Sequence, residues 1–343
     1  MREKYEQVDI VYAESLNRLI TQGYFSNLED FSSVLFVSSQ PFYEYYYDKF
    51  SKLFSSSLEF QWYICPNNIK ARGIDTFQSI LEYMEEMTTP ENTLIIGAGG
   101  AELFHLCGAL KKSSPYLSAF YYLPSTLSGF IDSLFGEVWL NNSKAIPSMK
   151  QKLLPDRVVY DTMLMELETR EVWRESFFKL IHLAVTQNAE LLKKIYQVSL
   201  SENYENFSPF IASIIQVIKK ENQFSSSFGK SFTKAFYRLE EAHYLNISQK
   251  EYIGFLLHLL WTLERSEVQF DYNKFYFWFE SIVGIELKLP EQMLITDLTE
   301  SLLIELTRYQ KILCLKEIGQ VDMVNIPDQE ELFKVIEMYR RIK

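Results

Sequence analysis

The sequence predicts an α/β domain followed by an all-helical domain. Through the first half of the chain, short apolar runs alternate with segments whose apolar residues recur at helical spacing. Beyond about residue 160 only the helical spacing continues. Strand–helix alternation is typical of a parallel sheet covered by helices on both faces. A chain of 343 residues is long enough for two domains, which we expect at 1–160 and 161–343.

Turn signals bound the predicted elements. The run VLFV is ended by SSQP, the next strand stops at Pro66, and a third ends in a glycine-rich segment. The predicted strands are residues 34–37, 58–65, 93–96 and 119–123, and the predicted helices between them are 42–53, 76–87 and 101–110. In the second half, helices are predicted at 166–198, 210–220, 231–242, 249–264 and 298–316.

Charge and composition exclude several classes of partner. The net charge is −11, whereas nucleic acid or an anionic membrane requires a basic face. No apolar run reaches the roughly 18 residues of a membrane span, and the polar start MREK is unlike a secretory signal. Cys65, Cys107 and Cys314 lack metal-type spacing and suit a reducing compartment. We therefore expect a cytoplasmic protein without a membrane span or a nucleic-acid partner.

A glycine-rich loop, with Gly97, Gly99 and Gly100, lies between a predicted strand and a predicted helix. In dinucleotide-binding folds such a loop lets the backbone approach a pyrophosphate, and amides at the helix start face the anion. Glycine also allows a tight strand-to-helix turn that binds no nucleotide. The loop alone leaves both interpretations open.

Residues 123–136, LPSTLSGFIDSLFG, contain a Pro-Ser-Thr-Leu turn, an Asp-Ser pair and a closing glycine. The segment resembles the P-T-T-L-x4-D-S-x-x-G-G-K signature of 3-dehydroquinate synthases and related sugar-phosphate cyclases, relatives of metal-dependent alcohol and glycerol dehydrogenases. The family's second glycine falls at Glu137 and its lysine at Val138. The resemblance implies a dehydroquinate synthase-like fold, with an N-terminal Rossmann-like domain, a C-terminal helical domain and a cleft between them.

The resemblance also implies where NAD would bind. In the family's P-x-G-E-x-x-K turn, the lysine position is Arg72 and the glutamate position is Ile69. The glycine triplet falls on residues 99–101, with Gly97 upstream, and the family aspartate falls at His105. The family positions that line the nicotinamide end are kept as Thr126, Leu127, Asp132 and Ser133. No cofactor is certain, and NAD stays open as a candidate.

The metal site that the resemblance implies is altered at every ligand. Counting onward from the strand RVVYD, the family glutamate falls at Lys179 and the two histidine ligands fall at Lys230 and Ile247. A motif lysine falls at His182, and a further motif histidine at Lys234. Zinc requires deprotonated donors, and an ammonium group supplies none. Zinc is therefore not expected, and the catalytic roles of these positions are in doubt.

Four of the altered or retained positions each have two interpretations. Lys179 and Lys230 would hold a phosphate or carboxylate, or they would point to solvent and pair with carboxylates. His182 would act as an acid or base, or it would be a packed, hydrogen-bonded histidine on an apolar helix. Asp132 would contact a ligand, or it would cap the next element.

We expect a degenerate family member, without 3-dehydroquinate synthase activity, that serves as a binding or scaffolding subunit in a biosynthetic or modification pathway. The loss of three metal ligands motivates this hypothesis. The chain would form a homodimer, as members of the family often do, or a complex with another protein. The alternative is a metal-free, NAD-dependent enzyme that acts on a sugar- or cyclitol-phosphate with Lys179 and Lys230.

Overall fold

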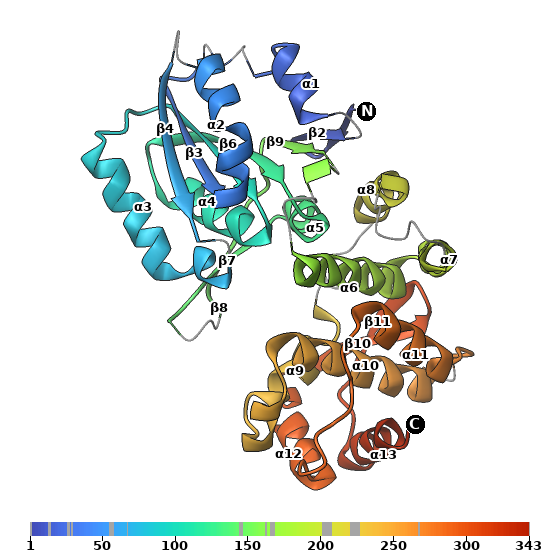
Figure 1. Ribbon diagram of the computed structural model, residues 1–343. Helices are drawn as coiled ribbons and strands as arrows, with labels where there is room; N and C mark the ends of the chain where they lie inside the picture. Colours follow the sequence, from blue (N-terminus) through green and yellow to red (C-terminus); the bar gives the residue numbers. More distant parts are fainter. Residues whose placement is uncertain are drawn as a thin grey trace. The chain divides into compact units, whose positions relative to one another are not determined.

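The chain folds into two compact units, which appear in Figure 1. The first, Met1–Ser176 with Glu205–Lys219, is called the sheet unit here, and the second, Phe177–Tyr204 with Lys220–Lys343, the helical unit. The computed structural model describes residues 2–12, 15–25, 28, 30–54, 58–66, 68–143, 147–161, 163–164, 169–200, 208–219, 227–266 and 268–342.

The sheet unit is built on seven strands in the order β1-β2-β9-β6-β5-β3-β4. All neighbours are parallel except β1 and β2, which are antiparallel. The strands are β1 (Arg2–Tyr5), β2 (Val8–Tyr12), β3 (Ser33–Ser39), β4 (Glu59–Cys65), β5 (Thr93–Gly99), β6 (Leu117–Pro124) and β9 (Arg157–Tyr160). The predicted α/β architecture is confirmed.

Helices follow the strands of this sheet in the alternating order that the sequence predicts. They are α1 (Leu16–Thr21), α2 (Gln40–Phe54), α3 (Ile74–Glu86), α4 (Ala101–Ser113), α5 (Leu127–Phe135) and α8 (Ile211–Lys219), with the short 3-10 helices η1 (Ile69–Arg72) and η3 (Ser208–Phe210). A separate hairpin, formed by β7 (Glu137–Asn141) and β8 (Pro147–Lys152), follows α5. Helix α8 contacts α5.

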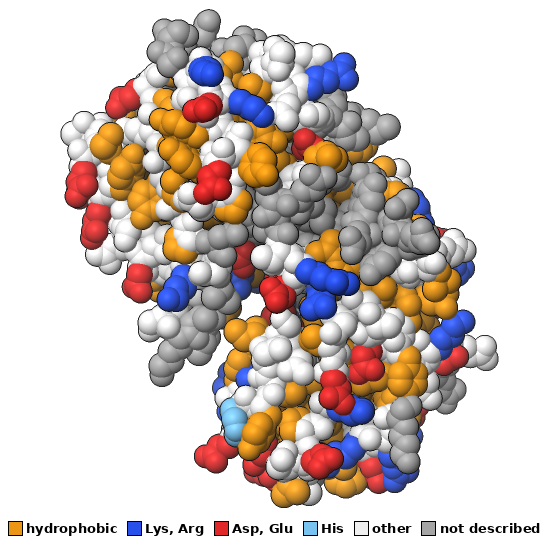
Figure 2. All heavy atoms as spheres, in the orientation of Figure 1, with side chains coloured by type: hydrophobic (Ala, Val, Ile, Leu, Met, Phe, Trp, Pro, Cys, Tyr) orange, Lys and Arg blue, Asp and Glu red, His pale blue; other side chains and the backbone are white. Residues whose placement is uncertain are grey.

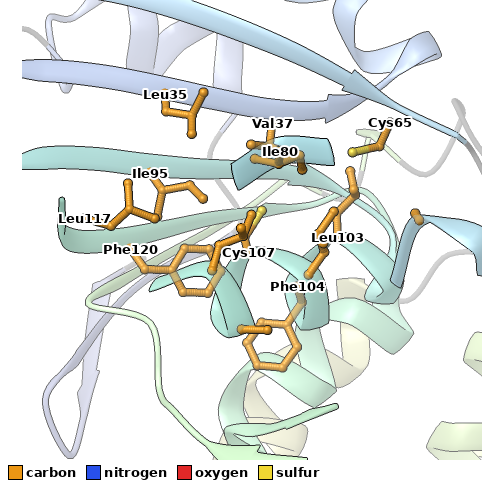
Figure 3. Close-up of a cluster of buried hydrophobic side chains, with 14 of the residues drawn as sticks. Leu35, Val37, Cys65, Ile80, Ile95, Leu103, Phe104, Cys107, Leu117 and Phe120 are labelled. Atoms are coloured by element: carbon orange, nitrogen blue, oxygen red, sulfur yellow. The ribbon is translucent and has the colours of Figure 1, made fainter. Parts of the chain in front are cut away.

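Alternate residues of the central strands enter two different cores. Val34 and Phe36 of β3 join the core that contains side chains of α1 and α2, whereas Leu35 and Val37 join the core that contains side chains of α3 and α4. Figure 3 shows the second core, with side chains of β3, β5 and β6 gathered around α4. Burial on both faces explains why these strands are continuous apolar runs.

Aromatic side chains gather on α2 and the edge strand β4. Phe36 stacks on Trp62 with 4.1 Å between ring centroids, and Trp62 meets Tyr43 edge-on at 5.4 Å. Tyr45 and Ile64 are 64% and 39% exposed. Figure 2 shows hydrophobic side chains, in orange, over the region where Figure 1 draws α2 and β4. Part of the high aromatic content therefore reaches the surface of the sheet unit.

The helical unit is organised around α10 (Ile247–Ser266), in which residues 252–263 are all buried. Helices α9 and α13 and strand β10 contact it. The other elements are α6 (Arg170–Gln187), α7 (Ala189–Ser199), α9 (Lys230–Phe236), the 3-10 helix η5 (Glu240–Tyr244), α11 (Tyr272–Val283), α12 (Ile295–Leu306), β10 (Lys311–Glu317), β11 (Gln320–Asn325) and α13 (Gln329–Arg340). Among the described residues, no helix is long and apolar enough to cross a membrane.

Three predicted helices of the second half are wrong in part. The helix predicted at 231–242 ends at Phe236, and the 3-10 helix η5 covers Glu240–Tyr244. The helix predicted at 298–316 ends at Leu306, and β10 pairs with β11 in a hairpin that turns at Gly319, where φ is 90°. Residues 312–315 are four buried apolar residues in succession, a pattern that short strands and buried helices share. The helix predicted at 166–198 is two helices, because Asn188 caps α7 by accepting a hydrogen bond from Leu191 N.

Replacing Gly254 by alanine is expected to destabilise the helical unit by about 1–3 kcal/mol. A Cβ at Gly254 would lie 2.4 Å from Thr233 Oγ1 and 2.6 Å from Thr233 N, so α9 must move away from α10. Urea unfolding followed by circular dichroism measures the change, with Ser248→Ala at an exposed position of α10 as the control. Equal unfolding midpoints for the two variants would contradict this account of the packing.

Candidate functional site

The glycine loop is a tightly packed turn at the end of β5. A Cβ at Gly97 would lie 2.8 Å from Cys107 Sγ, and one at Gly99 would lie 2.6 Å from Leu103 Cδ1. Gly99 also has a φ of 148°, which disfavours other residues. Gly100 is the N-cap of α4. Packing and backbone conformation alone therefore account for Gly97 and Gly99.

Tyr122 of β6 fixes the carbonyl groups of this loop from the core side. Its hydroxyl lies 2.9 Å from Gly99 O and 2.8 Å from Gly100 O, and its side chain is fully buried. A phenol has one proton, so the two carbonyl groups share a single donor. The loop is held in one conformation by the protein's own side chain.

Most polar groups of the signature turn are used inside the sheet unit. Thr126 is the N-cap of α5, and its Oγ1 accepts a hydrogen bond from Gly129 N at 2.9 Å. Ser133 Oγ donates to Phe130 O at 2.7 Å. Thr126, Leu127 and Ser133 are at most 1% exposed. The predicted nicotinamide-lining side chains at these three positions are therefore buried, and the two polar ones form hydrogen bonds within α5.

Asp132 caps neither end of α5, because Thr126 and Gly136 occupy the two caps. Its carboxylate Oδ2 lies 3.5 Å from His105 Nε2, and both residues are buried. His105 stands at the position of the family aspartate, so an aspartate of the signature now faces a histidine of the glycine-loop helix. Sequence reasoning missed this pair, since the two residues are on different helices and no spacing rule relates them.

His105 continues into a row of stacked side chains. Its ring centroid lies 3.8 Å from that of Trp139 in β7, and the Arg72 guanidinium lies 5.6 Å from the Trp139 centroid. Arg72 Nε is buried and has no hydrogen-bond partner among the described residues. The predicted adenosine contact Arg72 thus packs its cation against an aromatic ring of the same unit.

In the helical unit, the structure brings Lys179, Lys230 and His182 together. The pKa of His182 is lowered to about 4, mainly by burial. The hydrogen bond to Phe228 O raises this pKa, and the positive charges of Lys230 and Lys179 lower it. Lys234 lies one turn after Lys230 on α9, with its Nζ 3.5 Å from Tyr309 Oη. Ile247 begins α10 and is 49% exposed.

Aromatic side chains surround His182. Its Nε2 lies 2.9 Å from Phe228 O, and because a carbonyl oxygen only accepts, this nitrogen carries the proton. The rings of Phe178, Phe228 and Phe255 lie between 5.4 and 6.1 Å from the imidazole centroid. With a pKa of about 4, the ring is neutral near pH 7.

His258 is a second buried imidazole, and no sequence pattern predicts its role. Its Nδ1 accepts a hydrogen bond from Gly229 N at 2.7 Å, and its Nε2 lies 2.8 Å from Leu313 O. It lies between Phe228 and Phe232, with centroid distances of 4.0 and 4.6 Å and nearly parallel planes. Burial lowers its pKa to about 3. Both ring nitrogens are occupied, so His258 is not a replacement metal ligand.

Comparison with known proteins agrees with the resemblance in the sequence. No family model matches the chain. The 3-dehydroquinate synthases of Bacillus cereus and Bacillus mycoides are each 22% identical over 287 residues, which cover 78% of this chain and 78% of each relative. The chain is therefore similar to 3-dehydroquinate synthases over most of its length.

Solved structures of sugar-phosphate cyclases share the fold. A 2-deoxy-scyllo-inosose synthase complexed with carbaglucose-6-phosphate, NAD+ and Co2+ has a TM-score of 0.72 at 12% identity, covering 99% of this chain and 100% of that one. The 2-epi-5-epi-valiolone synthase of Streptomyces hygroscopicus subsp. jinggangensis 5008, with NAD+ and Zn2+ bound, has a TM-score of 0.74 at 14% sequence identity. The match covers 99% of this chain and 97% of that one. A structure outside the cyclases, a probable glycerol dehydrogenase from Sinorhizobium meliloti 1021, has a TM-score of 0.61 at 12% sequence identity. The match covers 97% of this chain and 96% of that one.

The residues at the family's metal positions do not fit a metal ion. Lys179 and Lys230 present ammonium groups, and Ile247 presents a hydrocarbon, whereas zinc takes thiolate, imidazole or carboxylate donors. In the part of the chain that the structure describes, no three His, Cys, Asp or Glu side chains are grouped so that they could hold a metal. Lys179, Lys230 and Ile247 therefore do not form a donor set that zinc takes.

The free energy of unfolding is expected to fall as the pH drops from about 6.5 to about 4, because His182 titrates at its ordinary pKa of 6.5 only when unfolded. The unfolded state then binds more protons than the folded state, so acid favours unfolding. His182→Gln retains a donor for Phe228 O and removes the titration. Between about pH 6.5 and pH 4, the free energy of unfolding of this variant should fall by about 1–3 kcal/mol less than that of the unsubstituted protein.

Urea unfolding at several pH values measures this difference. The exposed His243 provides the control variant His243→Gln. The buried His258 adds a further pH dependence that is common to all three proteins, since its pKa is also lowered. If His182→Gln lost stability as steeply as the unsubstituted protein, His182 would not be the buried neutral group described above.

Proposed function

We propose that this dehydroquinate synthase-like chain does not form 3-dehydroquinate and serves as a binding or scaffolding subunit beside an enzyme of a biosynthetic or modification pathway. The observation that carries the proposal is the donor set. Lys179, Lys230 and Ile247 stand at the three positions where the family's metal ligands are expected. A cation would be repelled by two ammonium groups there, and no neutral nitrogen or carboxylate replaces the lost donors at those positions.

The state of His182 supports the same proposal. A general base works best when its pKa lies near the operating pH. The pKa of His182 is about 4, and its Nε2–H is directed at Phe228 O. Three phenylalanine rings pack around the imidazole. These properties suit a structural histidine better than a proton-transfer group.

The signature turn, which belongs to the sheet unit, also supports the proposed function. Thr126 and Ser133 form their hydrogen bonds within α5, and Asp132 pairs with His105. Reactive side chains in an active site are normally directed at a ligand, whereas these are buried and matched within the sheet unit. In this proposal the polar side chains of the signature turn stabilise the sheet unit and do not bind a substrate. A partner, either a second copy of the chain or another protein, would use this fold as a platform.

The alternative function, a metal-free NAD-dependent enzyme acting on a sugar- or cyclitol-phosphate, rests on one observation. Lys179 and Lys230 lie close enough to His182 for both charges to lower its pKa. Paired ammonium groups attract phosphate or carboxylate groups. A 31P measurement of phosphate or sugar-phosphate binding, repeated with Lys179→Met/Lys230→Met, separates the two functions, because the scaffold requires no such binding.

The protein as isolated is expected to bind no stoichiometric zinc and to form no 3-dehydroquinate in the presence of Zn2+ or Co2+. Restoring the donor set with Lys179→Glu/Lys230→His/Ile247→His should create a saturable site for one zinc ion, because the variant supplies three ionisable ligands. Isothermal titration with Zn2+, followed by elemental analysis, measures both proteins.

A matched control places the same residue types at exposed positions. Lys193 and Lys316 are 68% and 65% exposed, so Lys193→Glu/Lys316→His adds a carboxylate and an imidazole away from the site. Stoichiometric zinc in the unsubstituted protein, or catalytic formation of 3-dehydroquinate, would overturn the proposed function.

A further inference from the structure

The seven-stranded sheet ends on one side at β4, which has none of the features that normally protect an edge strand. Among the described strands, only β3 pairs with β4, so one row of its backbone amide and carbonyl groups faces away from the sheet (Figure 1). Natural edge strands are often short or bulged, or they carry lysine or proline. β4 has seven residues in unbroken register with β3, and its sequence EFQWYIC contains no lysine, arginine or proline. This edge is therefore open to a further strand.

The opposite edge of the same sheet has the protection that β4 lacks. The edge strand there is β1, which has only four residues and carries the exposed cations Arg2 and Lys4. Short length and exposed charge both discourage pairing with another chain. The difference between the two edges points to strand pairing at β4 and not at β1.

The face of β4 that lies toward α2 is aromatic and partly exposed. Phe60 and Trp62 pack against the core that contains side chains of α2. The ring centroid of Tyr47, an exposed residue of α2, lies 5.5 Å from that of Trp62, and Ile64 is also exposed. Residues opposite each other on neighbouring strands place their side chains on the same face of a sheet. A strand paired with β4 would thus set alternate side chains against this apolar surface.

The other face of β4 lies beside α3, which is acidic. Tyr63 meets Tyr83 of α3 at 5.4 Å between ring centroids, and Ser79, one turn earlier, also interacts with the Tyr63 hydroxyl. Residues three and four apart are neighbours on a helix, so the exposed Glu82 and Glu86 adjoin this contact. Helix α3 contains no lysine or arginine. Figure 2 shows acidic side chains, in red, over the region where Figure 1 draws α3.

We propose that β4 binds an extended peptide segment of a partner protein, in which apolar residues alternate with lysine or arginine. The peptide adds a strand to the sheet, with its apolar residues against Trp62 and Tyr47 and its basic residues beside Glu82 and Glu86. Main-chain hydrogen bonds to the open edge supply affinity, and the alternation supplies specificity. This inference rests on the proposed function, because it names the chemistry of the partner that a binding subunit would take.

The charge of α3 favours such a peptide over a second copy of the chain. Antiparallel pairing of two β4 strands about a two-fold axis would place both α3 helices on the same face of the joined sheet. The carboxylates of the two helices would then repel each other, and α3 has no cation to offset them. A strand with basic residues on that face neutralises the same carboxylates.

The test is isothermal titration of the full chain at low salt with a short synthetic peptide that alternates lysine and valine. The control peptides have the same residues grouped in two blocks, or glutamate in place of lysine. We expect saturable binding of the alternating lysine peptide alone. Amide hydrogen exchange, followed by mass spectrometry, should slow at residues 59–65, because the added strand accepts hydrogen bonds from the open edge.

Glu82→Gln/Glu86→Gln removes two charges from α3 and keeps the shape of the side chains. It should weaken binding of the lysine peptide about three- to tenfold, and added salt should reduce this difference. The matched control is Glu6→Gln/Asp9→Asn, which removes two exposed carboxylates near the opposite edge of the sheet. Its affinity for the peptide should match that of the unsubstituted protein. Circular dichroism of each variant checks that the fold is intact.

Three results would overturn the β4 docking site: no saturable binding, binding without protection of residues 59–65, or equal losses in the two double variants. Dimerisation of the chain alone that Ile64→Lys abolishes, measured by sedimentation, would also overturn it, in favour of a second copy at β4. None of these results bears on the zinc titration. Failure of the docking site is therefore distinguishable from failure of the proposed function.

Discussion

Polar groups that a protein buries must find partners, because an unpaired buried donor or acceptor costs about 1–3 kcal/mol. At the two places where ligands would be expected, several buried polar groups have partners within the protein, whereas Arg72 Nε has none among the described residues. His258 joins Gly229 to Leu313, His182 bonds to Phe228 O, and Tyr122 holds the carbonyl groups of the glycine loop. The packing of α9 and α10 and of the loop between β5 and α4 depends on these bonds.

The same constraint explains how a family signature can outlast its chemistry. Gly97, Gly99 and Gly254 are each surrounded so closely that a Cβ would come within 2.8 Å of a neighbouring atom. Thr126 is needed as a helix cap. Selection for stability alone would keep these residues, whereas metal ligands that stabilise nothing without the metal are free to change. The proposed loss of metal ligands at Lys179, Lys230 and Ile247, beside retention of the glycines, would follow from this difference.

Sequence patterns predicted the sheet unit well because its strands are buried on both faces. The runs around Val34 and Leu94 are short, apolar and followed by turn residues, which specifies a parallel strand without further information. The same kind of run at 312–315 was ambiguous, because a buried strand and one face of a helix look alike over four residues. Residues 312–315 form a strand because they pair with β11 across the turn at Gly319, and this pairing cannot be predicted from the run itself.

The candidate site was predictable in part. The resemblance located Lys179, His182 and Lys230, and the structure places them near one another on α6 and α9. It could not predict that His105 faces Asp132, because this contact depends on side-chain directions across two helices. Local spacing fixes which residues share a helix face, but not which residue of another helix they meet.

The central claim is that the dehydroquinate synthase-like fold persists here without the metal site that the resemblance implies. X-ray diffraction at the zinc absorption edge, from crystals of the full chain grown with Zn2+, tests it most directly. We expect no anomalous zinc peak beside Lys179 and Lys230. A fully occupied zinc site at those lysines would contradict it.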